Sequence, residues 1–246
     1  MDIGKAISST GDLLFEFAFS LISIPKTFFK ILIHPTWATD YLTSLTSEKA
    51  KARFEKYSHP IFFWILVGVI PYFAIIHFHF IGGDEVTKNM RDAYKTIGTA
   101  NIISGLAIFL VSFPVSCAFI LQLFKYKDFV KSTFKRSFFI QLYLTAPVQF
   151  LYLFSLFATM VESKWLALLF LVLSLGSILW FLIAETHVIK KETQNNYLIS
   201  FFILILMYLI FFVFAGICMV IFFFMHMDSI QVLVDTYFRE LGIPLE

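Results

Sequence analysis

The sequence predicts an all-α protein: a polytopic transmembrane helix bundle of about five spans, with amphipathic interfacial helices at the N- and C-termini. Of its 246 residues, 59% are hydrophobic and only 15% are charged, whereas roughly a quarter are charged in soluble domains. Several apolar runs reach the ~20 residues that cross a bilayer as a helix. Two of them, 137–161 and 165–191, are separated only by Glu162, Ser163 and Lys164. A link this short predicts two antiparallel neighbours.

Residues 1–60 are expected to form a cytoplasmic or interfacial amphipathic segment followed by a basic connector. The run 13–33 is apolar but carries Pro25, Lys26 and Lys30 in its second half. Each charge at the middle of a bilayer costs roughly 2.5–3.5 kcal/mol. We therefore expect two helices that lie in the headgroup plane with Phe and Leu toward the acyl chains. An additional membrane span is the alternative.

Residues 61–227 are predicted to form the five-helix transmembrane bundle. Prolines within these apolar runs predict bends in the helices, and the small residues of the second run suit close helix packing. The tail 228–246 has apolar residues at helical spacing, which predicts a short amphipathic helix. The expected spans are 61–81, 98–124, 137–161, 165–191 and 197–227.

The positive charges predict the orientation of this bundle. With five spans and a cytoplasmic N-terminus, most of the 19 Lys and Arg residues fall on the cytoplasmic side, in the N-terminal segment and the loop 125–136. Cytoplasmic loops of membrane proteins carry an excess of Lys and Arg. We therefore expect the N-terminus in the cytoplasm and the C-terminus outside.

Composition and motifs exclude several classes of function. The formal net charge is only +2, and no basic face with interleaved aromatic residues predicts nucleic-acid binding. The two cysteines, Cys117 and Cys218, lie within apolar runs and are interpreted as small hydrophobic residues. The sequence contains no phosphate-binding loop and no HExxH, GxSxG or CxxC motif. We expect a protein that is not an enzyme and has no cofactor.

Few ionisable groups lie within the predicted spans, although pumps and proton relays require them there. Glu185 is placed at a cytoplasmic end. Gln141 and Gln149 are eight residues apart, roughly on one helix face with Thr145 between them. Two interpretations stay open: interhelical hydrogen bonding, or a polar path for a headgroup or solute that also includes Asn101.

Four residues near the predicted outer surface are weak candidates for metal binding. His77 and His79 lie near the outer end of the first span, and His226 and Asp228 lie at the outer end of the last. Such side chains can ligate a metal ion. However, a His-x-His pair on a helix directs its two rings to nearly opposite faces. Interfacial histidines that reach toward headgroups are therefore preferred, and no metal site is predicted.

Four sequence features together resemble a known family. They are the proline-bearing run FFKILIHPTWATDYL, the tripeptide SHP before the first span, LYLTAPVQFLYLF in the third span, and a tight hairpin ending in WFLIAETHVIKK. This pattern resembles the Yip1-type (Yip1 domain) five-span membrane proteins, the bacterial members more than the eukaryotic ones. The resemblance implies a protein of the bacterial inner (plasma) membrane that acts through partners or lipids. It transfers no catalytic residue.

The expected function is therefore a non-catalytic, Yip1-like integral membrane scaffold or accessory subunit. Its expected partners are membrane lipids and other membrane proteins or a second copy of itself. The alternative is a permease or lipid-handling transport component. In that case Pro71, Pro114 and Pro147 would let the bundle open around the polar path.

Overall fold

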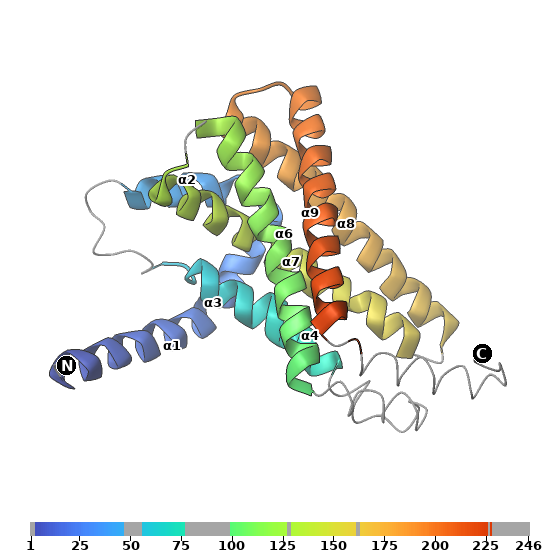
Figure 1. The fold of residues 1–246 in the computed structure, drawn as a ribbon, viewed down its shortest axis with the longest axis horizontal. Coiled ribbons are helices and arrows are strands. Elements are labelled where there is room, and N and C mark those ends of the chain that lie inside the picture. The colour runs from blue at the N-terminus through green and yellow to red at the C-terminus, as the bar shows by residue number, and fades with distance from the viewer. Residues whose placement is uncertain are drawn as a thin grey trace.

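The computed structural model confirms the all-α class (Figure 1). The residues that it describes are helical apart from short connections, and they contain no strand. These residues are 3–46, 56–76, 99–126, 129–160, 163–225 and 227.

The helices follow one another along the chain with short connections between the long ones. In order they are α1 (Ile3–Ile33), α2 (Trp37–Thr46), α3 (Pro60–Trp64), the π-helical turn η1 (Ile65–Val69), α4 (Ile70–Ile76), α6 (Thr99–Tyr126), α7 (Lys131–Met160), α8 (Lys164–Thr193) and α9 (Tyr197–Met225).

Four of the described helices, α6 to α9, are long and apolar enough to cross a membrane. They correspond to the second to fifth predicted spans. In the first predicted span, 61–81, the described residues form three consecutive helical elements, α3, η1 and α4, up to Ile76. The π-helical turn η1 ends two residues before Pro71, which lacks the N–H that would continue the helical hydrogen bonds. The described helices thus supply four spans of the five predicted.

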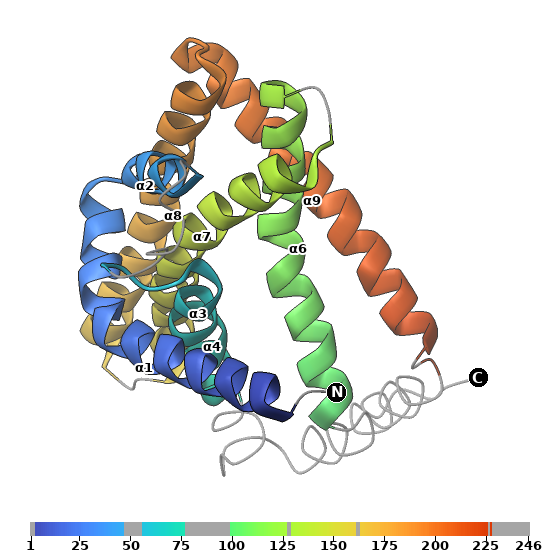
Figure 2. The same cartoon turned by 90° about the vertical axis from the view of Figure 1, so that its left-hand side faces the viewer.

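The prediction of two separate N-terminal helices is wrong, because α1 is one helix that continues through Pro25. The helix bends along its length rather than ending (Figure 2), as a proline inside a helix usually causes. Its polar side holds it to the connector before α3: the Thr27 hydroxyl accepts a hydrogen bond from the Ser58 N–H at 3.0 Å. This contact joins the part of α1 that follows the proline to the connector before α3.

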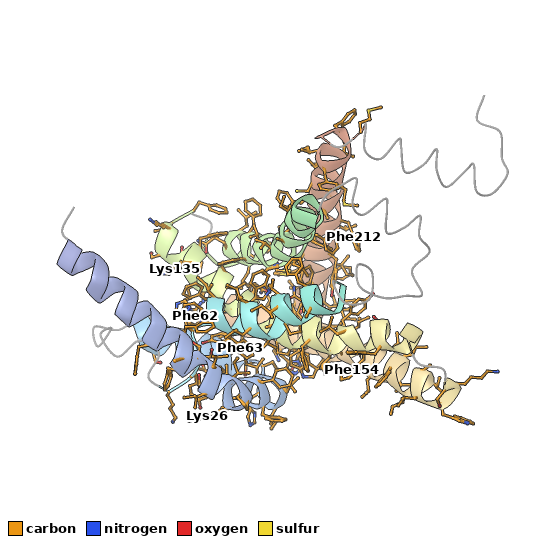
Figure 3. The ribbon with its side chains drawn as sticks, turned by 90° about the horizontal axis from the view of Figure 1, so that it is seen from below. Lys26, Phe62, Phe63, Lys135, Phe154 and Phe212 are labelled. Atoms are coloured by element: carbon orange, nitrogen blue, oxygen red, sulfur yellow. The ribbon has the colours of Figure 1, made fainter. Side chains whose placement is uncertain are left out.

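The outward side of α1 is mostly apolar. Ile22 is 80% exposed and Phe29 is 61% exposed, whereas Ser20, Ser23 and Thr27 are buried against the protein. Lys26 is also exposed, on the outer side of the helix (Figure 3). A helix that buries hydroxyls and exposes Ile and Phe is suited to an apolar environment rather than to water.

The helix α7 lies at the centre of the molecule. It contacts α6 and α8 extensively, and α1, α2, α3, η1 and α4 also pack against it. Figure 2 shows it crossing the middle of the structure, with α3 and α4 on one side and α6 and α9 on the other. Its residues Tyr143, Leu142 and Leu144 are among the largest fully buried side chains.

Short turns connect the last three helices, α7, α8 and α9. The predicted antiparallel hairpin is present: α7 ends at Met160 and α8 begins at Lys164. After α8, Gln194 adopts a left-handed conformation with φ 57°, which ends the helix. The Asn196 side-chain oxygen then accepts a hydrogen bond from the Ile199 N–H at 2.9 Å and caps the start of α9. The predicted C-terminal helix at 228–246 lies outside the described residues.

Candidate functional site

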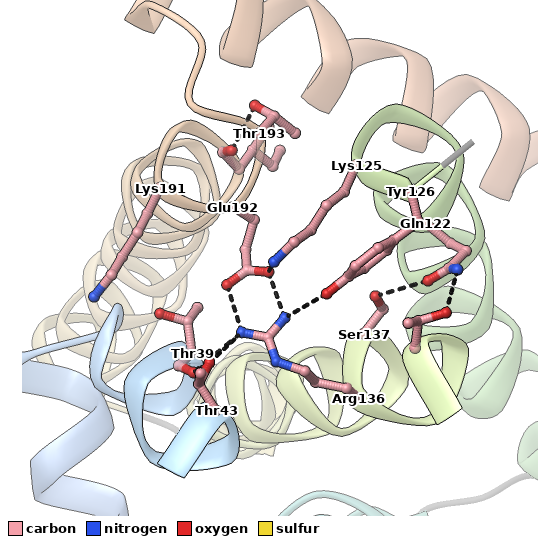
Figure 4. A network of polar contacts seen from close by, with 12 residues as sticks. Thr39, Thr43, Gln122, Lys125, Tyr126, Arg136, Ser137, Lys191, Glu192 and Thr193 are labelled. Carbon is pink, nitrogen blue, oxygen red and sulfur yellow. Dashed lines mark hydrogen bonds and ion pairs between the residues drawn. The ribbon is translucent and has the colours of Figure 1, made fainter. Parts of the chain in front are cut away.

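A cluster of charged side chains joins the helices at one end of the bundle (Figure 4). Arg136, in the second turn of α7, makes a two-pronged ion pair with Glu192 near the end of α8. The distances are 2.5 Å from Nη1 to Oε2 and 2.8 Å from Nη2 to Oε1. The side chains are only 11% and 3% exposed, respectively. This fork geometry is the strong form of an Arg–carboxylate contact.

The C-terminal end of α6 contributes a second cation to the same carboxylate. The Lys125 ammonium pairs with Glu192 Oε2, and the Tyr126 hydroxyl accepts a hydrogen bond from Arg136 Nη1 at 3.3 Å. Two positive charges thus share one buried negative charge. Glu192 therefore fixes the ends of α6, α7 and α8 relative to one another.

The helix α2 is held to the cluster by the same guanidinium group. Arg136 Nη2 donates to the Thr39 carbonyl at 3.2 Å and to the Thr43 hydroxyl at 2.8 Å. On the outside, Lys191 pairs with Asp40 of α2 at 2.6 Å. One arginine, supported by this outer pair, connects a surface helix to the three long helices.

Below the charged cluster, neutral groups close the turn between α6 and α7. Gln122 donates through Nε2 to the Thr133 hydroxyl at 2.6 Å. Its Oε1 atom accepts from the Ser137 hydroxyl at 3.4 Å. Gln122 and Ser137 are fully buried, so these bonds satisfy polar groups that have no access to water.

Deeper in the bundle, a second polar pair joins α7 to α8. Gln141 Nε2 donates to Glu185 Oε1 at 2.6 Å, and both residues are 0% exposed. Glu185, which the sequence places at a cytoplasmic end, lies about two turns before the end of α8 at Thr193. The covering helices bury it fully. Gln141 therefore takes part in an interhelical hydrogen bond, one of the two interpretations left open above.

Gln149 lies farther along α7, against the π-helical turn. A Cβ atom added to Gly68 would lie 2.3 Å from Gln149 Oε1, so the side chain occupies the space that a glycine leaves. Its Oε1 atom has no hydrogen-bond partner among the described residues. Gln141 and Gln149 thus contact different neighbours. The third predicted path residue, Asn101, lies in the first turn of α6, and the structure describes its backbone alone.

The four weak metal candidates, His77, His79, His226 and Asp228, lie outside the described residues. Within the described part of the chain, no group of three or more His, Cys, Asp or Glu side chains is positioned to hold a metal ion. Cys117 and Cys218 are both free thiols.

A histidine beside the bundle lies in an unusual electrostatic setting. His59 caps the start of α3, where its Nδ1 atom accepts a hydrogen bond from the Ile61 N–H at 3.3 Å. Burial, and then the positive charge of Lys135 (Figure 3), lower the pKa of His59 from 6.5 to about 4. The ring is therefore neutral near pH 7, as its role as an acceptor requires.

Sequence reasoning missed the charged cluster. Glu185 and Glu192 are seven residues apart, a spacing that places them on the same face of a helix. That spacing was a signal that this face of α8 is directed inward. The basic residues opposite belong to the loop 125–136, which was interpreted only as an indicator of orientation.

The fold and the cluster together define the class of protein. The described residues form an all-helical structure with four helices long and apolar enough to cross a membrane, and buried ion pairs hold three of these helices together at one end. No protein-family model matches the chain, and neither a curated protein nor a solved structure matches it.

Proposed function

We propose that this chain is a non-catalytic integral membrane scaffold or accessory subunit of the Yip1 type, in the bacterial plasma membrane. It acts by binding other membrane proteins, a second copy of itself, or membrane lipids. The N-terminus is cytoplasmic and the C-terminus lies outside.

The charged cluster is the observation that carries this proposal. Arg136, Lys125 and Glu192 bind one another across three helices. In this arrangement their charges are used to hold helices together, and the cluster favours a rigid framework. Buried ionic groups of this kind also specify which helix ends meet.

The distribution of apolar surface supports binding through the outer faces of the helices. Leu179 on α8 is 62% exposed and Phe212 on α9 is 65% exposed (Figure 3). Exposed apolar faces on spanning helices contact either lipid or the helices of another protein.

The position of the basic residues supports the proposed orientation. The ends of α6, α7 and α8 that meet at the charged cluster also carry Lys125, Lys131, Lys135, Arg136 and Lys190. Because cytoplasmic ends of membrane proteins are enriched in Lys and Arg, we assign this end to the cytoplasm.

Site-specific photo-cross-linking in native membranes tests the scaffold proposal. A photoreactive phenylalanine analogue placed at Leu179 or Phe212 is expected to form adducts with a membrane protein or a second copy of the chain. The matched control is Phe181 on α8, which is 2% exposed and should form no intermolecular adduct. Lipid adducts alone from both exposed positions would contradict binding to a protein partner.

A transport component is the second candidate, favoured by unpartnered oxygen atoms along α7. Gln141 Oε1 and Gln149 Oε1 are buried and have no hydrogen-bond partner among the described residues. With Asn101, they would line a path for a solute or a lipid headgroup. Flux through reconstituted vesicles tests this candidate, with the Gln149→Leu variant as control. Flux that is absent, or that is unaffected by the substitution, would count against it.

A further inference from the structure

The buried pair of Glu185 and Gln141 leaves two oxygen atoms without donors. Gln141 Nε2 already donates to Glu185 Oε1. Glu185 Oε2 and Gln141 Oε1 are fully buried and have no hydrogen-bond partner among the described residues. An ionised carboxylate and an amide oxygen are both acceptors only, so these two atoms cannot satisfy each other while Glu185 is charged.

One proton removes this mismatch. Bound to Glu185 Oε2, it turns an acceptor into an O–H donor and provides the donor that Gln141 Oε1 lacks. A carboxylic acid and a carboxamide can then form two hydrogen bonds in opposite directions, each group donating once and accepting once.

Among the described residues, no cation forms an ion pair with Glu185. Cys117 on α6 and Tyr208 on α9 lie within its electrostatic reach, and neither carries a positive charge. Arg136 and Lys125 are both engaged by Glu192. A buried carboxylate without a cation is costly because the protein interior does not replace its hydration.

We infer that Glu185 and Gln141 form a proton-binding site between α7 and α8, in which the carboxyl group of Glu185 carries the proton and donates it in a hydrogen bond to Gln141 Oε1. The proton comes from the aqueous phase. This site is independent of the scaffold function proposed above.

Infrared spectroscopy of the purified full-length protein at neutral pH tests the site. The wild-type spectrum is expected to contain a carboxylic acid C=O band that shifts in D₂O and that the spectrum of the Glu185→Gln variant lacks. The difference spectrum of the two proteins should therefore show this one band. A difference that contains carboxylate bands instead would overturn the inference. The amide of Glu185→Gln reproduces the donor and acceptor of the protonated acid, so an unchanged melting temperature is also expected.

A second variant keeps the test decisive if Glu185→Gln fails to fold. Gln141→Leu removes the amide, so the C=O band of the acid should remain but move to a higher frequency. A band at an unchanged position would contradict the pairing. The spectra are also recorded with Na⁺ or K⁺ added in excess. If the acid band is present only without these ions, Glu185 is a cation ligand rather than a proton carrier, and the inference fails.

Discussion

The helices α7 and α8 have the same length, 30 residues each, but opposite surroundings. In the most apolar stretch of each helix, 61% of the α7 residues are buried but only 17% of the α8 residues, although α8 is the more apolar of the two. The buried face of α7 carries Ser137, Gln141 and Thr145, all of them fully buried. The exposed surface of α8 consists largely of Leu, Ile and Val.

This contrast is the reverse of the order in water-soluble proteins, where the most apolar helix lies deepest. In a membrane, lipid tails are as apolar as leucine, so burial of apolar side chains provides little drive for packing. Polar groups have no partner in lipid and must find one inside the protein. The polar residues of α7 therefore place it at the centre. The predictions below test this view.

Removal of the Glu192 charge should have the largest effect. The Glu192→Gln substitution leaves Arg136 and Lys125 close together without a counter-charge. Breaking a buried ion pair in this way typically costs about 3–5 kcal/mol. We expect a loss of this size in the free energy of unfolding, measured by denaturant titration in mixed micelles.

The matched control is Asp40→Asn, which breaks the outer pair with Lys191. Asp40 is 65% exposed and Lys191 is 38% exposed, and exposed pairs contribute about 0–1 kcal/mol. Equal losses of unfolding free energy for Asp40→Asn and Glu192→Gln would contradict the role of Glu192 in holding α6, α7 and α8 together.

Leucine truncations on the two helices test the contrast directly. Leu144 on α7 is 0% exposed, and Leu175 on α8 is 54% exposed. Leu144→Ala leaves a cavity in a packed interior and should cost about 2–5 kcal/mol. Leu175→Ala exchanges one lipid-facing side chain for another and should cost less than about 0.5 kcal/mol. Thermal unfolding of both variants in the same detergent measures the difference. A similar loss at both sites would show that α8 is covered by protein.

Protonation of His59 should reduce stability in acid. Its pKa is about 4 in the folded protein and 6.5 ordinarily, so below pH 6.5 the unfolded chain binds a proton that the folded chain does not. Stability is therefore retained above pH 6.5 and falls as the pH decreases toward 4, by at most about 3 kcal/mol. The pH dependence of unfolding measures it. His59→Asn preserves a capping side chain without the titration, so an identical pH profile for this variant would exclude His59 as the cause.

Local patterns in the sequence predicted the class of fold and the four long helices. Apolar run length alone located α6 to α9, and the three-residue link between 161 and 165 predicted the α7–α8 hairpin. These features depend on neighbouring residues, which a single sequence displays directly.

The charged cluster could not be predicted in the same way, because its members are distant in the chain. Arg136 and Glu192 are separated by 56 positions, and nothing local shows which loop charge meets which helix end. The apolar composition of the run 61–81 predicts a span bent at Pro71. Pro71 predicts a bend in this run, but the composition does not show the π-helical turn η1 or its packing against α7.

The smallest effect is expected where α7 meets the π-helical turn. Gly68→Ala would place a methyl group 2.3 Å from Gln149 Oε1. This atom is at the end of a flexible side chain that can move aside, so we expect a cost of about 1 kcal/mol, at the lower limit for overpacking. Gly176→Ala on α8 is the control: among the described residues, nothing beyond the adjacent residues and nearby backbone of α8 itself lies within 4 Å of the added methyl group. The substitution should therefore stabilise the helix by about 0.5–1 kcal/mol. The Gly68→Ala, Gln149→Ala double variant should recover the loss, since the collision is with the Gln149 side chain. If Gly68→Ala stabilises the protein as Gly176→Ala does, the surroundings of α7 are packed no more tightly than those of α8, and the comparison of the two helices fails.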